Sequence, residues 1–246
     1  MPEKYHMNLK KLSRHQKKLR KRVIEISYKR KTSHIGSCLS AVDLIEAAYR
    51  FKKRGERFIL SCGHSGFALY VILEQYHYLK PNDINKFHIH PDKNIKKDIH
   101  VSTGSLGQGL PIAIGIALAH KNKNVYCLIS DGECAEGSIW ESLRVAVDQK
   151  MNNLVIILNA NGWGAYDAIH LKTLYRRLKA FSSYIVKVDG HNIKEINKAL
   201  HVKHKDGPLL IFAHTRSDQL PFLRGLDAHY YVMKDKDYKL ALKLLQ

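Results

Sequence analysis

Three short segments of the chain concentrate residue types that bind phosphate groups. Residues 61–66 read SCGHSG, residues 102–109 read STGSLGQG, and residues 130–137 read SDGECAEG. Glycine lets the backbone approach a ligand closely, and free N–H groups at the start of a helix bind anions. The three segments therefore predict a site for a ligand that carries phosphate.

The glycines of the second segment do not complete a nicotinamide-binding motif. Gly107 and Gly109 supply G-x-G, but Ile112 occupies the third glycine position of the G-x-G-x-x-G pattern. No long apolar strand precedes the segment either. A dinucleotide-binding domain is therefore not expected.

Two side chains that carry oxygen follow the apolar runs of neighbouring predicted strands. Asp131 comes directly after the run 125–130, and Asn161 follows the run 153–159. Parallel strands present their carboxyl ends at one edge of a sheet, and ligands bind there. Hard divalent cations prefer carboxylate, amide and carbonyl oxygens. The pair therefore predicts a divalent cation held against the phosphates of a ligand.

At Asp131 and Asn161 the sequence resembles a known cofactor-binding motif. An Asp-Gly pair followed downstream by an Asn in N-G is similar to the thiamine-diphosphate-binding motif. Other segments resemble those of transketolases: TSHIGS around His34, LSCGH around His64, IHP around His90, STGSLGQG at 102–109, and VDGH at 188–191. The resemblance runs from about residue 33 to residue 246.

The resemblance implies a cofactor and a metal ion. Thiamine diphosphate would be bound together with Mg²⁺ or Ca²⁺. The protein ligands of the metal would be the side chains of Asp131 and Asn161 and the carbonyl oxygen of Trp163. Trp163 could instead be a packing residue. The implied contacts of the cofactor are His64, Gly104, Ser105, Leu106, Gly132, Glu133, Asn161 and His229.

The resemblance also implies that several histidines act on the substrate. Imidazoles exchange protons near neutral pH, so this residue type suits proton transfer. Glu136 and Glu141 resemble paired carboxylates that link two active sites across a dimer interface, although Glu136 could simply be an acid favoured in the first turn of a helix. The implied catalytic residues are His34, His64, His90 and His229.

Several positions depart from the family pattern. Ser130 replaces the first glycine of G-D-G, Ser33 replaces the glycine before His34, and Ala228 precedes His229 where a tryptophan is common. The largest departure is length, because 246 residues leave no room for the middle domain of a complete transketolase. In the family, that domain supplies the glutamate that protonates the cofactor's aminopyrimidine ring. We therefore expect a separately encoded C-terminal partner subunit, with two copies of each subunit in the assembly.

These features predict the N-terminal subunit of a transketolase-like transferase that is active only with its partner. It would move a two-carbon ketol unit between sugars or sugar phosphates. One alternative is a subunit of another two-subunit thiamine-diphosphate enzyme, such as a 2-oxoacid dehydrogenase or decarboxylase. Another is a degenerate scaffold or binding protein without catalysis. The sequence identifies neither the sugars nor the pathway nor the partner.

The elements that must position these residues alternate along the chain. This alternation predicts an α/β fold, in which a parallel sheet has helices on both faces. The resemblance implies the same fold, that of the diphosphate-binding (PP) domain. Since no linker divides the sequence, one domain is expected over residues 1–246. Apolar runs typical of strands lie at 57–61, 125–130, 153–159, 184–188 and 209–213, and helical candidates at 66–78, 106–120, 138–149 and 193–200.

Two more helices are predicted ahead of the first strand. Leucine and isoleucine residues near helical spacing predict a basic helix over residues 7–31. Ser40 is the predicted N-cap of an apolar helix over residues 41–50. Farther along, Asn192 followed by Glu195 predicts a capped start for the helix at 193.

The formal net charge is +19, and much of it lies in the first 32 residues. Clustered Lys and Arg can neutralise nucleic-acid phosphates, but aromatic residues are not interleaved among them as a stacking surface. The sequence therefore favours a solvated basic helix over nucleic-acid binding. A third alternative is that the positive field attracts small anionic substrates.

Features of membrane and secreted proteins are not found in the sequence. The longest apolar stretch, residues 110–119, is too short to cross a bilayer, and the charged start lacks the apolar core of a signal peptide. The cysteines at 38, 62, 127 and 134 form no C-x-x-C pair, which argues against a disulfide framework or structural zinc. We expect a cytoplasmic protein with reduced thiols.

Overall fold

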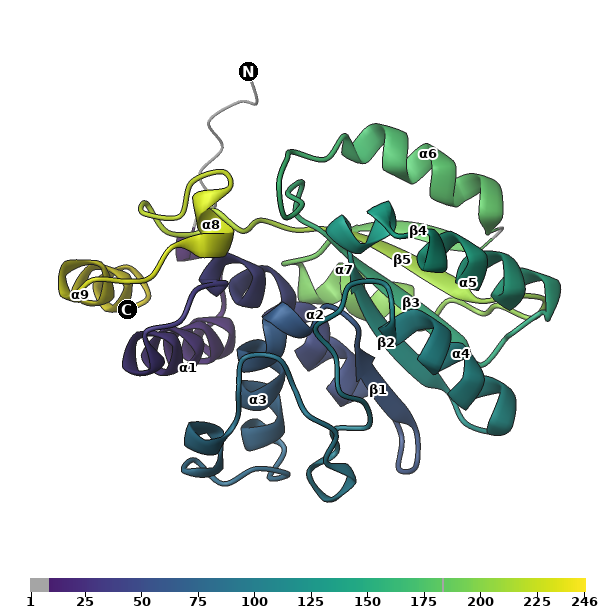
Figure 1. Ribbon diagram of the computed structural model, residues 1–246, viewed down its shortest axis with the longest axis horizontal. Coiled ribbons are helices and arrows are strands. Elements are labelled where there is room, and N and C mark those ends of the chain that lie inside the picture. Colours follow the sequence, from purple (N-terminus) through teal and green to yellow (C-terminus); the bar gives the residue numbers. More distant parts are fainter. Residues whose placement is uncertain (1–8, 183) are drawn as a thin grey trace.

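A five-stranded sheet forms the centre of the structure (Figure 1). The computed structural model describes residues 9–182 and 184–246. All neighbouring strands pair in parallel, in the order β1-β2-β3-β5-β4. The predicted strands are confirmed to within one residue at each end. They are β1 (Arg57–Leu60), β2 (Val125–Ser130), β3 (Leu154–Ala160), β4 (Ile185–Asp189) and β5 (Leu209–His214).

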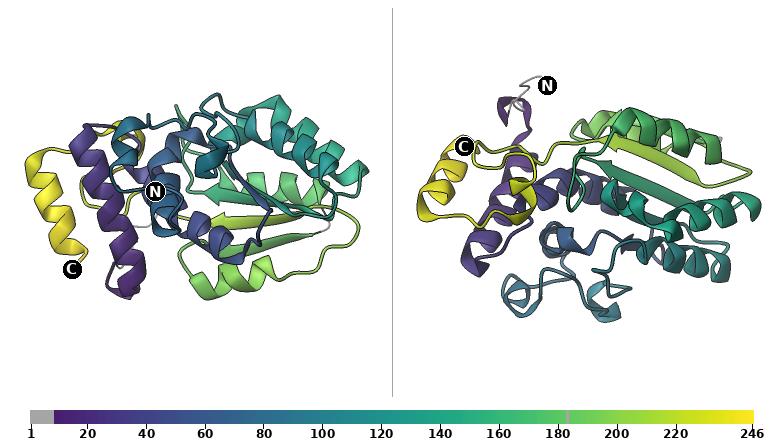
Figure 2. Two further views of the ribbon diagram at one scale, coloured as in Figure 1. Left: turned by 90° about the horizontal axis from the view of Figure 1, so that it is seen from below. Right: turned by 45° about the horizontal axis from the view of Figure 1, so that its top comes forward.

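Helices cover both faces of the sheet, as predicted (Figures 1 and 2). Side chains of β2 alternate between two apolar clusters: Leu128 faces one and Cys127 the other. Burial on both faces explains why the strand is an unbroken apolar run. Within one cluster lie α1 (Arg14–Arg30), α2 (Ile35–Phe51), α3 (Gly66–Gln75), α7 (Ile193–Leu200) and α9 (Asp235–Leu244). Within the other lie α4 (Gly109–Ala119), α5 (Gly137–Asp148) and α6 (Leu171–Phe181).

Helix α2 begins earlier than predicted. It starts at Ile35 with His34 in the N-cap position, and fifteen of its 17 residues are buried. The Ser40 hydroxyl does not cap a helix, because it donates to the carbonyl oxygen of Ser37 at 2.9 Å and accepts from the amide of Asn159 at 2.9 Å. Ser40 therefore forms a buried hydrogen bond with the distant Asn159 instead of the N-cap hydrogen bond that the sequence predicted.

The basic helix α1 is shorter than the predicted range 7–31. Ser13 and Gln16 form a reciprocal capping box that starts the helix at Arg14. Leu9–Lys11 is a separate 3₁₀ turn, and residues 7 and 8 lie outside the described residues. The helix ends at Arg30 because Lys31 is left-handed, with φ of 48°.

Other helix boundaries also differ from the predictions. The helix predicted at 106–120 begins at Gly109, because Gly107 has a φ of +80° that interrupts a right-handed helix. Helix α7 starts at Ile193 with Asn192 as its N-cap, as predicted, and this side chain accepts from the N–H groups of Lys194 and Glu195. Helices α6 and α9 were not predicted, although leucines at 171, 174 and 178 have helical spacing. None of the described helices is long and apolar enough to span a membrane.

A buried ion pair connects α1 to α2. Arg20 and Asp43 have side chains 1% and 0% exposed, and the guanidinium donates to both carboxylate oxygens at 3.0 and 2.5 Å. Gln219 accepts from Arg20 at 2.8 Å, and the Nδ1 of His191 lies 2.9 Å from Asp43. Burial raises the pKa of Asp43, but the charge and hydrogen bonds of Arg20 outweigh it and hold this pKa below its usual range. One of the cations assigned to a solvated helix is therefore part of the core.

Removing one charge of this pair should destabilise the protein strongly. In Asp43→Asn the guanidinium of Arg20 stays buried without a counter-ion, so the free energy of unfolding should fall by about 3–5 kcal/mol. Urea denaturation of the chain measures the change. The control is Asp148→Asn, which breaks an exposed pair with Arg144 and should cost less than about 1 kcal/mol. Equal losses for the two variants would contradict a structural role for the buried pair.

Candidate active site

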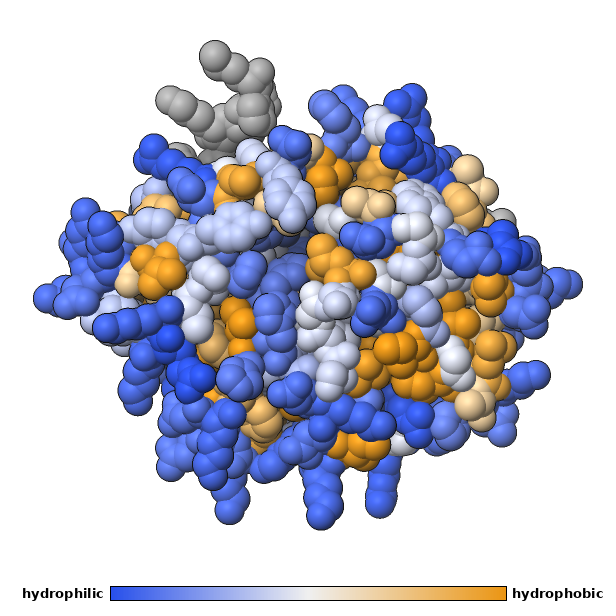
Figure 3. Space-filling model, viewed as in Figure 1, coloured by the Kyte–Doolittle hydropathy of each residue, from blue (hydrophilic) through white to orange (hydrophobic). Residues whose placement is uncertain are grey.

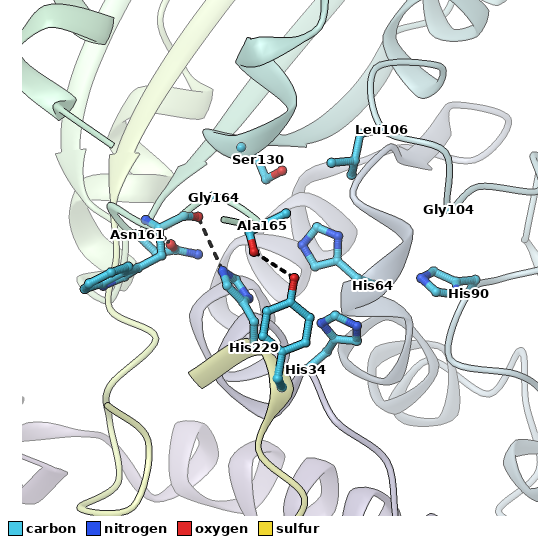
Figure 4. Close-up of a pocket in the computed structure, with 13 residues that line it drawn as sticks. His34, His64, His90, Gly104, Leu106, Ser130, Asn161, Gly164, Ala165 and His229 are labelled. Atoms are coloured by element: carbon cyan, nitrogen blue, oxygen red, sulfur yellow. Dashed lines mark hydrogen bonds between the residues drawn. The ribbon is translucent and has the colours of Figure 1, made fainter. Parts of the chain in front are cut away.

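Four histidine side chains converge on one cavity, of about 170 Å³, at the carboxyl ends of the strands (Figure 4). The ring of His34 lies 5.6 Å from that of His64 and 6.3 Å from those of His90 and His229. The rings of His64 and His229 are 6.2 Å apart. These residues are far apart in sequence, so the fold brings together all four predicted catalytic histidines.

The start of α2 is fastened to the short helix α8 (Asp227–Tyr230). The backbone N–H of His34 donates to the carbonyl oxygen of His229 at 2.6 Å, and the Ser37 hydroxyl lies 2.7 Å from the Nδ1 of His229. A Cβ on Gly36 would lie only 2.7 Å from the carbonyl oxygen of Ala228. The glycine in H-I-G-S is therefore needed for this close approach, which sets two of the histidines beside each other.

The backbone of His34 is itself unusual. Its φ of 64° and ψ of 22° place it in the left-handed region, which is uncommon for a residue with a side chain. The Nδ1 atom of its ring is buried and has no hydrogen-bond partner among the described residues. Strained backbone and an unpaired buried polar atom both indicate a residue whose position serves a ligand.

A single buried carboxylate joins the three segments that the sequence singled out. Glu133 is 0% exposed and accepts hydrogen bonds from the hydroxyl of Ser61 at 2.5 Å, the N–H of Gly107 at 3.0 Å and the N–H of Ser130 at 2.9 Å. Burial raises its pKa, while these hydrogen bonds act in the opposite direction. Glu133 does not line the cavity, and its predicted contact with the cofactor stays a prediction. Its carboxylate holds the surrounding loops together.

Asp131 and Asn161 leave the sheet side by side. Asp131 is 2% exposed, and its oxygens accept from the N–H groups of Gly132 at 3.0 Å and Gly162 at 2.6 Å. Burial, outweighing these bonds, raises the pKa of Asp131 to about 7, and no cation compensates it among the described residues. The carbonyl oxygen of Trp163 lies 3.4 Å from the Nε2 of His229.

This donor set fits a divalent cation. A buried carboxylate without a counter-ion gains most from a nearby positive charge, and Asn161 and the Trp163 carbonyl add the oxygen ligands that Mg²⁺ and Ca²⁺ prefer. The described residues contain no group of three or more His, Cys, Asp or Glu side chains that could hold a metal ion. Such a cation would therefore depend on phosphate oxygens of a ligand to complete its coordination.

Most of the predicted site residues line the cavity, and some do not. Ser105 and Asp131 are not among the lining residues, and Asp131 reaches the cavity through its neighbour Gly132. The lining includes residues that were not predicted, namely Ser130, Gly164, Ala165 and Tyr230. The sequence pointed to them only by position: Ser130 begins the segment 130–137, Gly164 and Ala165 follow Trp163, and Tyr230 follows His229. The predicted residues that line the cavity are His34, His64, His90, Gly104, Leu106, Gly132, Asn161, Trp163 and His229.

Glu136 and Glu141 lie outside the cavity on the exposed surface. Glu141 pairs with Arg144 at 2.5 Å. The neighbouring helix α4 exposes Ile112 and Leu118, each 40% accessible, and Figure 3 shows apolar side chains on this part of the surface. Exposed apolar groups next to acidic ones are typical of a protein interface.

Burial lowers the pKa of His34, His64 and His229 and so favours their neutral forms. Burial, and then the neighbouring imidazoles, lower the pKa of His34 from 6.5 to about 4 and that of His64 to about 3. Burial also lowers the pKa of His229, against a smaller opposite effect of its hydrogen bond to Trp163. Near pH 7 these rings are therefore neutral, and each offers one N–H donor and one acceptor nitrogen for hydrogen bonds.

Comparison with known proteins supports the family that the motifs indicated. Residues 13–219 match the family model described as transketolase, thiamine diphosphate binding domain. The chain belongs to the transketolase family. A solved transketolase from Campylobacter jejuni superposes with a TM-score of 0.80 at 26% identity, covering 94% of this chain and 42% of that one.

Two relatives differ in how much of their length the chain covers. A transketolase of Pongo abelii is 34% identical over an alignment 215 positions long, which covers 75% of this chain and 33% of that protein. One of the subunits of an apulose-4-phosphate transketolase of Phocaeicola vulgatus is 29% identical over an alignment 267 positions long, which covers 96% of this chain and 94% of that relative. The chain thus spans about a third of the first relative and nearly all of the second.

Weakening the Glu133 contacts should loosen the cofactor site. In Glu133→Gln one carboxylate oxygen becomes an NH₂ group, which cannot accept from the N–H groups that face it. We expect about 10-fold weaker binding of thiamine diphosphate with Mg²⁺, measured by calorimetric titration. The control is Glu25→Gln, at a partly exposed pair with Arg22, which should bind normally. Unchanged affinity in Glu133→Gln would show that the loops hold their positions without this carboxylate.

The lowered pKa values predict how stability depends on pH. Between the unfolded pKa of 6.5 and the folded values near 4 and 3, the unfolded chain binds more protons, so the free energy of unfolding should fall as the pH drops through this range. In the double variant His34→Gln/His64→Gln this fall should be shallower. Urea denaturation from pH 7 to pH 4 measures both slopes. Equal slopes would mean that these imidazoles are not desolvated in the folded protein.

Proposed function

We propose that the chain is the N-terminal subunit of a two-subunit, thiamine-diphosphate-dependent enzyme that transfers a two-carbon ketol unit between sugars or sugar phosphates. The observation that carries this proposal is the convergence of four histidine rings on the cavity that Gly132 and Asn161 also line. The proposed site for diphosphate and metal would therefore open directly onto groups that can bind hydroxyls and move protons. Family membership supports the cofactor, since the matching family model describes a thiamine diphosphate binding domain.

The residues at the strand ends would hold the cofactor. Asp131, Asn161 and the Trp163 carbonyl would bind Mg²⁺, while the N–H of Gly132 and the ring of His64 would contact the diphosphate. Gly104 and Leu106 would line the ring system. When bound, the cofactor would supply the electron sink for breaking and forming the carbon–carbon bond. The polypeptide's task is to orient the reactants and to move protons.

The hydrogen bonds of His229 define its tautomer. The Trp163 carbonyl can only accept a hydrogen bond, so the proton of the neutral ring lies on Nε2, and Nδ1 accepts from the Ser37 hydroxyl. His34 has its Nδ1 buried and, among the described residues, unpaired, so a hydroxyl that reached this atom would gain a hydrogen bond. Two neutral imidazoles on one side of the cavity are suited to proton exchange at a sugar carbonyl and hydroxyl.

A second polypeptide would complete the site. The relative that the chain covers almost entirely is named as one subunit of its enzyme, and the complete transketolase is about three times as long as the matched region. The exposed apolar side chains of α4, beside Glu136 and Glu141, offer a surface for that partner. The assembly would contain two copies of each polypeptide, with the acidic pair close to the interface.

Replacing the proposed metal ligand should remove cofactor binding. In Asp131→Ala the affinity for thiamine diphosphate with Mg²⁺ should fall about 100-fold or more, because the cation loses its proposed carboxylate ligand. Calorimetry on the chain together with its partner measures this. The control is Asp167→Ala, at an exposed aspartate on the adjoining loop, which should bind as the unaltered protein does. Unchanged affinity in Asp131→Ala would show that the metal assignment is wrong.

The same preparation tests the reaction. Xylulose 5-phosphate with an aldose acceptor should be consumed in the presence of the partner, and Asp131→Ala should abolish the turnover. Turnover with pyruvate alone would assign the chain to the 2-oxoacid enzymes. Failure of the complex to bind thiamine diphosphate would favour a scaffold or binding protein without catalysis.

A further inference from the structure

A tyrosine spans the mouth of the histidine cavity. The ring of Tyr230 lies 6.1 Å from that of His34 and 6.4 Å from that of His229. Its hydroxyl donates to the carbonyl oxygen of Ala165 at 2.7 Å, the dashed line at Ala165 in Figure 4. The side chain lines the cavity and yet the residue is 51% exposed, so it lies where the cavity meets solvent.

The hydrogen bond of Tyr230 joins two segments that meet over the cavity. One segment contains α8, and the other is the loop that follows β3. They also meet where the Nε2 of His229 approaches the Trp163 carbonyl, and where a Cβ on Gly225 would lie 3.3 Å from the Trp163 ring. With its base on α8 and its hydroxyl fastened to Ala165, the rigid ring cannot swing aside unless this bond breaks.

The wall that Tyr230 forms is apolar and uncharged. Among the described residues that line the cavity there is no Lys or Arg. This side of the site therefore offers no cation to the phosphate of a sugar phosphate. Discrimination here must depend on size and shape, which is what a fixed aromatic ring imposes.

We propose that Tyr230 is a specificity-determining residue that limits the length of the acceptor sugar able to reach His34 and His229. This inference rests on the proposed ketol transfer. The ring narrows the approach, so short acceptors such as a two-carbon hydroxyaldehyde pass more easily than a five-carbon aldose. The bond to Ala165 maintains the restriction by holding the ring in place.

Two variants separate the ring from its hydrogen bond. Tyr230→Ala removes both, and Tyr230→Phe keeps the ring but releases it from Ala165. The holoenzyme with its partner, thiamine diphosphate and Mg²⁺ is assayed with xylulose 5-phosphate as donor and either glycolaldehyde or D-ribose as acceptor. Unphosphorylated acceptors keep charge out of the comparison. In Tyr230→Ala the ratio of kcat/KM for ribose to that for glycolaldehyde should rise about tenfold, with Tyr230→Phe in between.

A matched control and a second readout make the test decisive. Tyr166 lies on the same loop as Ala165 but is 86% exposed, so Tyr166→Ala should leave the ratio unchanged. The rate at which diethyl pyrocarbonate modifies His34 in the chain without its partner, followed by mass spectrometry, reports access without turnover. It should be faster in Tyr230→Ala.

The outcomes distinguish the two proposals. An unchanged acceptor ratio in an active enzyme overturns the role of Tyr230. If the unaltered complex binds thiamine diphosphate but transfers no ketol unit to any aldehyde, the proposed function fails. In that case the rate at which diethyl pyrocarbonate modifies His34 is the only test of Tyr230. Equal rates in Tyr230→Ala and the unaltered chain would show that the ring does not restrict access to His34, and a faster rate in the variant would support the restriction.

Discussion

The parallel pairing of β2 with β3 sets the geometry of the whole site, because Ser130 lies opposite Asn159 where the two strands end. Because of this register, Asp131 and Asn161 follow the ends of the two strands at the same edge of the sheet. The N–H of Gly162 can therefore donate to the Asp131 carboxylate. A slip of one residue would turn these side chains to the other face of the sheet. Because both faces are apolar, it is the close packing of their side chains that resists that slip, so the packing of the core also positions the proposed metal ligands.

Around this edge the protein buries groups that would ordinarily be charged or hydrated. Burial keeps His34 and His64 neutral, and it raises the pKa of Asp131 to about 7. Glu133 is buried as well, but both of its oxygens are hydrogen-bonded to the surrounding loops. Both oxygens of Asp131 also accept backbone N–H groups, but Asp131 lies between Ser130 and Gly132, which line the cavity, so it is the acid proposed to meet a cation. The position of each carboxylate relative to the cavity, rather than its burial, distinguishes the two.

Much of the fold could be predicted from the sequence, because strands buried on both faces are unbroken apolar runs with little ambiguity. Elements that depend on tertiary partners could not. Ser40 looked like a helix cap, but Asn159, more than a hundred positions away, uses its hydroxyl. Arg20 looked like one more solvated cation of a basic helix, but Asp43 on the next helix pairs with it in the core. In each case the competing partner is distant in sequence, and no local pattern reveals it.

The sequence by itself determined the order of strands along the chain, the family and the residue types that could bind diphosphate, metal and sugar. These follow from short-range patterns: apolar runs, glycines in loops and histidines within motifs. Only the tertiary structure decided which of them share a cavity. It showed that Glu133 hydrogen-bonds to the loops around the cavity, and it brought Tyr230 and Ala165 together. Such contacts depend on the distances between separate segments, and those distances exist only once the segments have packed against one sheet.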